Sequence, residues 1–115
     1  MVQTKRLGKI ESISFGLGGY QEAMLGLSLT LSSKEECWGV GDFKGTWDYN
    51  LIECTEHCKW TEEDRSNIFL EIMKLISDLL RDAKVYKLND LVNKPVECTF
   101  EGNKLIEWRI LKEVL

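Results

Sequence analysis

Apolar and polar residues alternate with a period of two in several stretches of the chain. The clearest is Leu25–Leu31, where four leucines are separated by Gly26, Ser28 and Thr30. This period predicts a β-strand with one buried face. Four other segments show a similar alternation and are also predicted to be strands, at about residues 9–15, 37–43, 96–101 and 106–111.

The segments between these strands are predicted to be turns and loops. The glycine-rich stretch Phe15–Gln21 reads as a loop after the first strand, and Ser32–Glu36 as the turn of a hairpin. Glu101–Lys104 reads as the short turn of a second hairpin. Residues 45–60 show neither period and are predicted to be irregular.

A helical pattern begins after Thr61. Apolar residues then recur at spacings of three and four up to Ala83, with charged residues elsewhere around the helix. The sequence Thr61-Glu62-Glu63-Asp64 resembles a capping box, and its acids suit the positive end of a helix. We therefore predict a helix over about residues 62–84. Its apolar stripe is interpreted as core: Ile68, Phe69, Ile72, Met73, Ile76, Leu79, Leu80 and Ala83.

The element order β-β-β-α-β-β favours an α+β fold in which one helix covers one face of a mostly antiparallel sheet. With 115 residues, 43% of them hydrophobic, residues 1–115 are expected to form a single domain around one core. Apolar residues remain on both faces of the last strand, with Leu105 and Leu111 opposite Trp108. A homo-oligomer is therefore expected.

The charge balance argues against duplex nucleic acid as a partner. The chain has 15 Lys+Arg and 19 Asp+Glu, a net charge of -4, whereas phosphate-backbone binding favours a basic surface. No segment approaches the ~20 apolar residues that cross a membrane, and the first ten residues do not resemble a signal peptide. A cytoplasmic protein with reduced cysteines and no membrane partner is expected.

Cysteine and histidine residues raise the question of a metal site. Cys37, Cys54, His57 and Cys58 supply the ligand types of a closed zinc site, but Cys54 and Cys58 are four residues apart, not the commoner pair spacing. The alternative is that Cys37 and Cys98 are small core residues and the others belong to an ordinary loop. Whether they bind zinc stays open, and no cofactor is predicted.

Catalytic motifs are not evident. His57 is the single histidine, and no serine-containing elbow or paired-carboxylate motif stands out. His57 and Cys58 are adjacent, so in extended backbone they point to opposite faces and do not make an activated pair. The chain is predicted to bind a ligand and not to be an enzyme.

Two features suggest a ligand site. Glycines in the Gly18–Gln21 loop would let backbone amides approach an anion. The segment matches neither the dinucleotide fingerprint nor the Walker pattern, however, so a plain flexible or bulged connection is the favoured interpretation. Arg109 lies opposite the predicted core position Trp108, so it is available to a ligand or to a partner subunit.

Several segments resemble a family of small phage-encoded proteins. These are residues 13–25 (ISFGLGGYQEAML), residues 38–43 (WGVGDF) and the segment from Pro95, which begins PVE, to the final WRILKEVL. The family is similar to the Thoeris anti-defence sponge proteins, which bind cyclic ADP-ribose-type and cyclic oligonucleotide signals. The resemblance implies a phage counter-defence protein in the host bacterial cytoplasm that sequesters such a signal without cleaving it.

The resemblance also implies where the ligand binds. Nucleotide pockets would lie near the subunit interfaces of a homo-oligomer, with an aromatic ring on the base and arginine and amide side chains on the phosphates and ribose. Arg109 is the first candidate for the phosphate contact. The other candidates are Asn89, Asn93 and Asn103 for the amides and Gly18, Gly19, Tyr20 and Gln21 for the opposite wall.

An alternative function is an acidic inhibitor that blocks a protein of a bacterial defence complex, as some anti-CRISPR proteins do. Such a protein would present clustered acids to a basic groove. The candidate acids are Glu35, Glu36, Glu62, Glu63 and Asp64, which a solvated turn and a helix N-terminus explain equally well.

Overall fold

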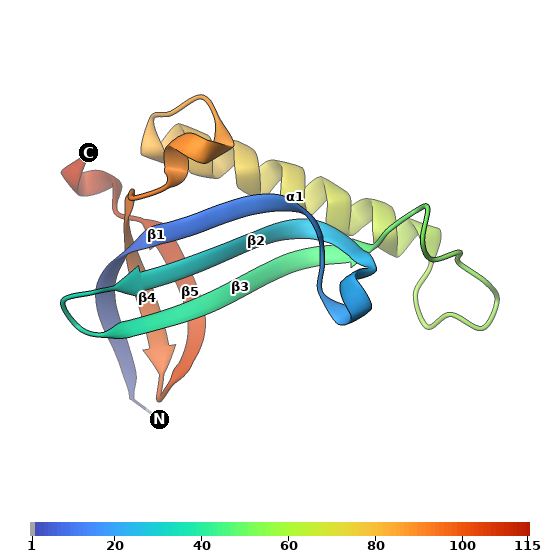
Figure 1. The fold of residues 1–115 in the computed structure, drawn as a ribbon, viewed down its shortest axis with the longest axis horizontal. Coiled ribbons are helices and arrows are strands. Elements are labelled where there is room, and N and C mark those ends of the chain that lie inside the picture. The colour runs from blue at the N-terminus through green and yellow to red at the C-terminus, as the bar shows by residue number, and fades with distance from the viewer. Residues whose placement is uncertain (1) are drawn as a thin grey trace.

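The computed structural model describes residues 2–115, which form one five-stranded sheet and one long α-helix (Figure 1). Neighbouring strands are antiparallel, in the spatial order β3-β2-β1-β4-β5. The predicted α+β class, five strands and helix are confirmed. The elements are β1 (Gln3–Gly18), β2 (Met24–Ser33), β3 (Trp38–Trp47), α1 (Glu62–Ala83), β4 (Pro95–Glu101) and β5 (Lys104–Ile110), with 3-10 turns η1 (Tyr20–Glu22), η2 (Leu88–Leu91) and η3 (Lys112–Val114).

Strand β1 belongs to two sections of the sheet. Its first part, residues 3–9, pairs with β4, and its second part, residues 9–18, pairs with β2. The register with β2 shifts between Ile10 and Ser12, which is a β-bulge, and a bulge bends its strand and increases the local twist. As a result, β4 and β5 run at a steep angle to β2 and β3, and the sheet is curled (Figure 1).

The curl brings the edge strand β3 into contact with β4 and β5. The ring of Trp38 in β3 packs edge-on against Phe100 in β4, with 5.3 Å between centroids. The Nε1 of Trp108 in β5 donates a hydrogen bond to Asp42 Oδ2 in β3, at 3.3 Å. Residues about 60 positions apart in the chain therefore meet across the concave side of the sheet.

The core lies between this concave side and α1. The apolar side chains buried in this core make the main contribution to the stability of the fold, at roughly 25 cal/mol per Å² of surface removed from water. Lys44 in β3 and Glu71 in α1 form an ion pair at 3.1 Å at the margin of this layer. The buried side chains include Ile10, Leu27, Leu29 and Leu31 from β1 and β2, Ile72, Leu79 and Ala83 from α1, and Val96, Cys98, Phe100 and Ile110 from β4 and β5.

Helix α1 begins and ends as the sequence predicts, to within one residue. The Thr61 hydroxyl accepts a hydrogen bond from Asp64 N at 3.1 Å, and Asp64 Oδ2 accepts one from Thr61 N at 2.7 Å. This reciprocal pair is the predicted capping box. Lys84 ends the helix with a left-handed backbone, φ +59°.

The predicted loop at Phe15–Gln21 is partly wrong, because β1 continues through Gly16 to Gly18. The reason is packing on the sheet. A Cβ on Gly18 would lie 3.3 Å from the Phe43 ring, and one on Gly45 would lie 2.7 Å from it. Glycines therefore make room for Phe43 inside regular strands. Strand β3 accordingly extends to Trp47, two residues past Gly45, into a segment predicted to be irregular.

Two predicted core positions, Cys37 and Met73, and one residue predicted on the outer face, Leu105, also need correction. Cys37 is exposed, because it lies in the β2–β3 turn with φ +58°. Met73 is 51% exposed, because α1 is in contact mainly with β3 and this side chain falls on the flank of the helix. Leu105 packs against the core, because a register shift between Thr99 and Phe100 places Leu105 opposite Phe100.

Candidate functional site

Two hollows flank the turn that joins β2 to β3. Each also takes residues from the first part of β1, which lies beside this turn. The aromatic hollow has a volume of about 470 Å³ and is lined by Arg6, Glu36, Cys37, Trp38, Gly39, Val40, Phe100, Gly102 and Asn103. The lysine hollow has a volume of about 380 Å³ and is lined by Leu7, Gly8, Lys9, Ser32, Ser33, Lys34 and Glu35.

Trp38 is held in place at the aromatic hollow from three sides. Its Nε1 donates to Glu36 Oε2 at 3.2 Å, and Phe100 packs against its ring. Behind it, a Cβ on Gly8 would lie 2.8 Å from the Trp38 ring and 2.6 Å from Ser32 O. Glycine at position 8 therefore lets the indole of Trp38 pack directly against β1. These three contacts hold the ring in one position.

The polar groups of the aromatic hollow are less constrained. Arg6 keeps 45% of its side chain exposed, and its nearest carboxylate, Glu36, is 3.8 Å away. Its guanidinium carbon is 6.0 Å from the Phe100 ring centroid. Asn103 lies in the β4–β5 turn beside Gly102, whose φ of +64° favours glycine. A ligand would meet a guanidinium and an amide next to aromatic rings.

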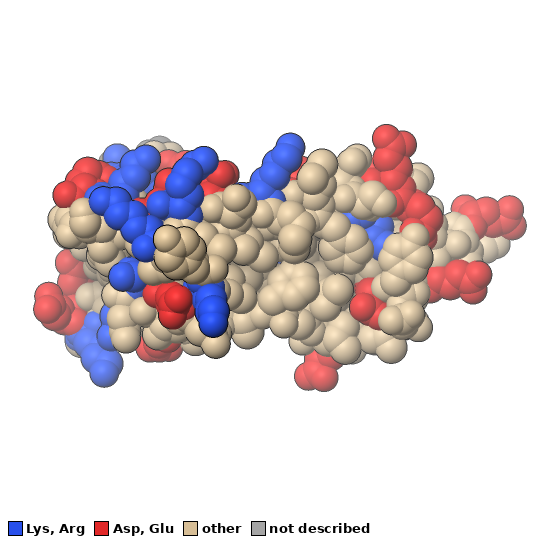
Figure 2. All heavy atoms as spheres, turned by 90° about the horizontal axis from the view of Figure 1, so that it is seen from above, with Lys and Arg blue, Asp and Glu red and all other residues tan. Residues whose placement is uncertain are grey.

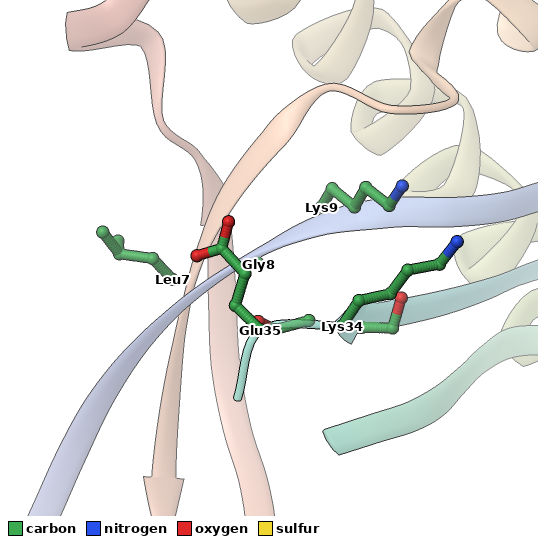
Figure 3. Close-up of a pocket in the computed structure, with 7 residues that line it drawn as sticks. Leu7, Gly8, Lys9, Lys34 and Glu35 are labelled. Carbon is green, nitrogen blue, oxygen red and sulfur yellow. The ribbon is translucent and has the colours of Figure 1, made fainter. Parts of the chain in front are cut away.

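The lysine hollow presents two ammonium groups. Figure 3 shows Lys9 and Lys34 extending toward the same side, while Leu7 points away from them. Among residues 2–115, neither lysine has a carboxylate partner within 4.0 Å. The Ser32 hydroxyl donates to Glu11 Oε1 at 3.3 Å, and Ser33 Oγ accepts from Glu36 N at 3.1 Å. With two ammonium groups and one carboxylate, that of Glu35, in its lining, the hollow has a net positive charge in a chain that is acidic overall.

Arg109, the first residue predicted to bind phosphate, is engaged by carboxylates. Its Nη1 and Nη2 donate to the two oxygens of Glu113 at 2.8 and 2.7 Å, and its Nε donates to Glu97 Oε1 at 3.2 Å. These hydrogen bonds raise the pKa of Arg109, and the bond from Arg109 lowers the pKa of Glu113 to about 2. A phosphate would have to displace at least one carboxylate to reach this guanidinium.

The other predicted site residues lie in separate places. The Gly18–Gln21 loop lies at the end of β1, where Gly19 and Gln21 have positive φ and the Tyr20 ring packs edge-on against Trp47 at 6.2 Å. Arg109 in β5 pairs with Glu97 in β4, and Glu97 pairs in turn with Leu7 in β1. Leu7 precedes Gly18, where the loop begins, by eleven residues of β1. At ~3.3 Å per residue, about 35 Å of strand separates this loop from the neighbourhood of Arg109.

Only Asn103 among the predicted ligand residues lines the aromatic hollow. Asn93 instead has φ +72°, and its backbone N donates to Ile10 O at 2.7 Å, so it serves the connection between η2 and β4. Three cationic residues of the two hollows, Arg6, Lys9 and Lys34, were not predicted. The available signal was the basic character of residues 5–9, which becomes informative only once β1 is known to extend from Gln3.

The candidate metal ligands are the cysteine residues and His57. His57 is 88% exposed and lies 3.6 Å from Glu56. Within residues 2–115, no group of three or more His, Cys, Asp and Glu side chains is arranged to hold a metal ion. Within the same range, no helix is both long and apolar enough to cross a membrane.

Comparisons with known proteins do not indicate a function, so the geometry of the two hollows is the main guide. No protein-family model, curated protein or solved structure matches this chain.

Proposed function

We propose that the chain binds a nucleotide-derived immune signal, a cyclic ADP-ribose isomer or a cyclic oligonucleotide, in the aromatic hollow and sequesters it without cleaving it. The observation that supports this proposal is that an indole, a guanidinium and an amide side chain line one hollow. Its volume of about 470 Å³ falls in the range of small-molecule sites, ~300–1,000 Å³. The phage counter-defence role rests on the resemblance of the segments named above.

Each group has a distinct part in this binding mode. A base stacks on the exposed part of Trp38, an interaction worth ~1–3 kcal/mol per base. Arg6 exchanges its loose contact with Glu36 for a phosphate, because a planar guanidinium bonds two phosphate oxygens at once. Asn103 supplies amide hydrogen bonds to the ribose or the base. Lys9 and Lys34, across the turn, attract the anion toward the site.

The lining of the aromatic hollow supports sequestration over cleavage. Its one nucleophile is the thiol of Cys37, and its one carboxylate, Glu36, already accepts a hydrogen bond from Trp38. Nucleophilic catalysis needs a base in hydrogen-bond contact with the attacking group, and the Cys37 thiol instead donates to Lys34 O at 3.6 Å. The polar groups of this lining are therefore better suited to recognition than to catalysis.

The acidic inhibitor remains the second candidate. Figure 2 shows that charged side chains at one end of the molecule are mainly acidic, whereas basic and acidic side chains are mixed at the other. However, the five candidate acids do not form one surface. Glu35 and Glu36 lie at the β2–β3 turn, whereas Glu62, Glu63 and Asp64 start α1 at the opposite end of the molecule (Figure 1). For this reason the nucleotide ligand is favoured.

A homo-oligomer is also proposed, supported by the open edge of β1. Among the described residues, the segment 11–18 pairs with β2 only, and its other edge has no strand beside it. Phe15 and Leu17 on this segment are 40% and 57% exposed. Residues 12–18 of this segment carry no charged side chain, and an uncharged, exposed edge strand readily pairs with a second copy. Light scattering should show an oligomer for the natural chain and a smaller species for Leu17→Lys. An unchanged mass would argue against this edge.

A thermal-shift panel tests the proposed ligand class. The purified protein is mixed with cyclic ADP-ribose isomers, cyclic di- and trinucleotides, ADP-ribose and NAD, and the bound ligand is released and chromatographed. At a hundred times its dissociation constant, a ligand stabilises the fold by ~2.7 kcal/mol, which shifts the melting temperature by several degrees. Recovery of intact ligand is expected, and recovery of a converted product would contradict sequestration.

Point variants assign the site. Arg6→Gln should weaken binding by roughly 10- to 150-fold, since a charge-assisted hydrogen bond contributes ~1.5–3 kcal/mol. Arg81→Gln is the matched control, because Arg81 is 73% exposed on α1. Arg109→Ala distinguishes the two arginine sites: if it weakens binding more than Arg6→Gln, the ligand lies at β5. A panel without any shift would favour the acidic inhibitor, to be followed by capture of a host protein.

A further inference from the structure

The irregular loop between β3 and α1 is anchored by a buried arginine. Arg65 is 1% exposed, and its guanidinium lies between the rings of Tyr49 and Trp60, at 4.4 and 4.7 Å from their centroids. Its Nη2 donates to Ile52 O at 2.8 Å. These contacts fix the loop on both sides of Cys54 and Cys58, so the two thiols are held in a defined arrangement.

A turn inside this loop brings the two cysteines together. Cys58 N donates to Thr55 O at 3.1 Å, which folds the chain back on itself. The sulfur of Cys58 then accepts a hydrogen bond from Thr55 N at 3.3 Å. Because Thr55 N is covalently bonded to the carbonyl carbon of Cys54, the Cys58 sulfur lies against the backbone of Cys54. Both thiols are partly exposed, and neither is in a disulfide.

We propose that Cys54 and Cys58 are a reversible disulfide site, oxidised by exchange with a small-molecule disulfide such as oxidised glutathione. The bond would close a ring of five residues within the anchored loop. The site is independent of the aromatic hollow, which takes none of its lining from this loop.

The surroundings of the two sulfurs give them different roles. Hydrogen bonds from the backbone N and the hydroxyl of Thr55 lower the pKa of Cys58. Burial raises the pKa of Cys54, whose thiol donates to Trp60 O at 3.5 Å. The thiolate is the attacking species in disulfide exchange. Cys58 is therefore the first nucleophile, and Cys54 is the thiol that resolves the mixed disulfide.

The exchange proceeds in two balanced steps. The Cys58 thiolate attacks one sulfur of oxidised glutathione, forming a mixed disulfide and releasing one glutathione thiolate. Cys54 then loses its proton to solvent and attacks the Cys58 sulfur, which releases the second glutathione thiolate. Both released thiolates take up protons according to the pH. The two protein thiols are oxidised by two electrons, and one molecule of glutathione disulfide is reduced to two thiols.

The remaining cysteines serve as internal controls. Cys37 is exposed, and its thiol donates to Lys34 O at 3.6 Å in the β2–β3 turn. Cys98 is fully buried in β4, and burial raises its pKa to about 11. An exposed thiol with no thiol partner should stop at the mixed disulfide, and a buried thiol should not react in the folded protein.

Thiol trapping tests the proposal. The folded protein is equilibrated with reduced and oxidised glutathione at graded ratios, quenched with an alkylating reagent and analysed by peptide mass spectrometry. The peptide containing Cys54 and Cys58 should lose both alkylation sites together, with a mass decrease of two hydrogens, while Cys98 stays reduced. If both thiols remain alkylated at every ratio, or carry only separate glutathione adducts, the proposal is overturned.

Serine variants test the order of attack. Cys54→Ser should accumulate glutathione on Cys58 faster than Cys58→Ser accumulates it on Cys54, by several-fold or more. Cys37→Ser should form the internal disulfide at the rate of the natural chain. Equal rates of adduct formation in the two single variants would overturn the assignment of Cys58 as the first nucleophile, and circular dichroism of each variant confirms that it is folded.

Discussion

An arginine lies near aromatic rings at each end of the sheet, but one arginine is buried and the other is exposed. Arg65, at the end near α1, is 1% exposed, stacked between Tyr49 and Trp60, and bonded to a backbone carbonyl. Arg6, at the end near the β2–β3 turn, keeps 45% of its side chain exposed. Its nearest ring, that of Phe100, is 6.0 Å away. The first arginine is used for packing, and the second is available to a ligand.

The contrast shows why residue type alone does not assign a site. A guanidinium near aromatic rings is a common ligand-binding combination, yet at Arg65 the same combination closes a loop. What distinguishes the two is burial: the guanidinium of Arg65 is enclosed, although its Nε has no hydrogen-bond partner among residues 2–115, whereas Arg6 is open to solvent. Arg109 is a third case, because Glu97 and Glu113 occupy its donors although the side chain is 46% exposed.

The largest expected effect concerns the arginine used for packing. Arg65→Met keeps an apolar chain of similar length but removes two cation–π contacts and leaves Ile52 O without its donor. Desolvated cation–π contacts contribute ~2 kcal/mol or more, and a hydrogen bond from a charged group, such as the part-buried one to Ile52 O, contributes ~1.5–3 kcal/mol. Chemical denaturation should therefore show a loss of roughly 2–4 kcal/mol in the free energy of unfolding.

Matched variants sharpen this result. Arg81→Met changes the same residue type on the same helix at a 73% exposed position, and it should alter the stability by less than ~0.5 kcal/mol. Arg6→Met should behave like Arg81→Met. If Arg6→Met destabilised the fold as strongly as Arg65→Met, the distinction between a packed and an available arginine would be lost.

A smaller effect is expected at the wall of the aromatic hollow. In Gly8→Ala the new Cβ would lie 2.6 Å from Ser32 O and 2.8 Å from the Trp38 ring, so the indole has to move. Overpacking of this kind costs ~1–3 kcal/mol. Gly16→Ala is the control on the same strand, because a Cβ there meets no atom within 4 Å. The two variants are compared by thermal unfolding and by ligand binding.

Gly8→Ala also tests the role of Trp38. Because the Trp38 ring shifts, the Gly8 variant should lose ligand affinity beyond its loss of stability, whereas the Gly16 variant should bind normally. Equal affinity in both variants at a temperature where both are folded would mean that the position of the Trp38 ring does not matter for binding.

The sequence predicted the elements better than the site. Local periodicity fixed the helix and the leucine strand, since each depends on residues a few positions apart. The aromatic hollow depends on the bulge between Ile10 and Ser12, which curls the sheet and brings Trp38 to Phe100. Trp38 and Phe100 are about sixty positions apart in the chain, so no local sequence pattern predicts their contact. Arg109 was predicted to be available to a ligand because the strand period places it opposite Trp108. The period does not reveal that Glu113, after the end of β5, accepts hydrogen bonds from its guanidinium.

The smallest expected effect is at the ion pair of Arg109 and Glu113. The folded-state pKa of Glu113 is lowered to about 2 from an ordinary value of 4.5, mainly by the hydrogen bonds from Arg109. A carboxylate with a lowered pKa contributes stability that is present above its unfolded-state pKa and is lost as the pH falls through the folded-state value. This contribution should therefore be complete above about pH 4.5 and should disappear between there and about pH 2.

The variant Glu113→Gln isolates this contribution, which is expected to be small because both side chains are largely exposed. Its free energy of unfolding should fall below that of the natural chain at pH 6, and the difference should shrink toward zero at pH 2. Glu107→Gln on the same strand as Arg109 is the control, as Glu107 forms none of the ion pairs of Arg109. A pH-independent difference for Glu113→Gln would show that the ion pair does not persist in solution. The Nη2 donor of Arg109 would then be open to a ligand, while Nε keeps its bond to Glu97.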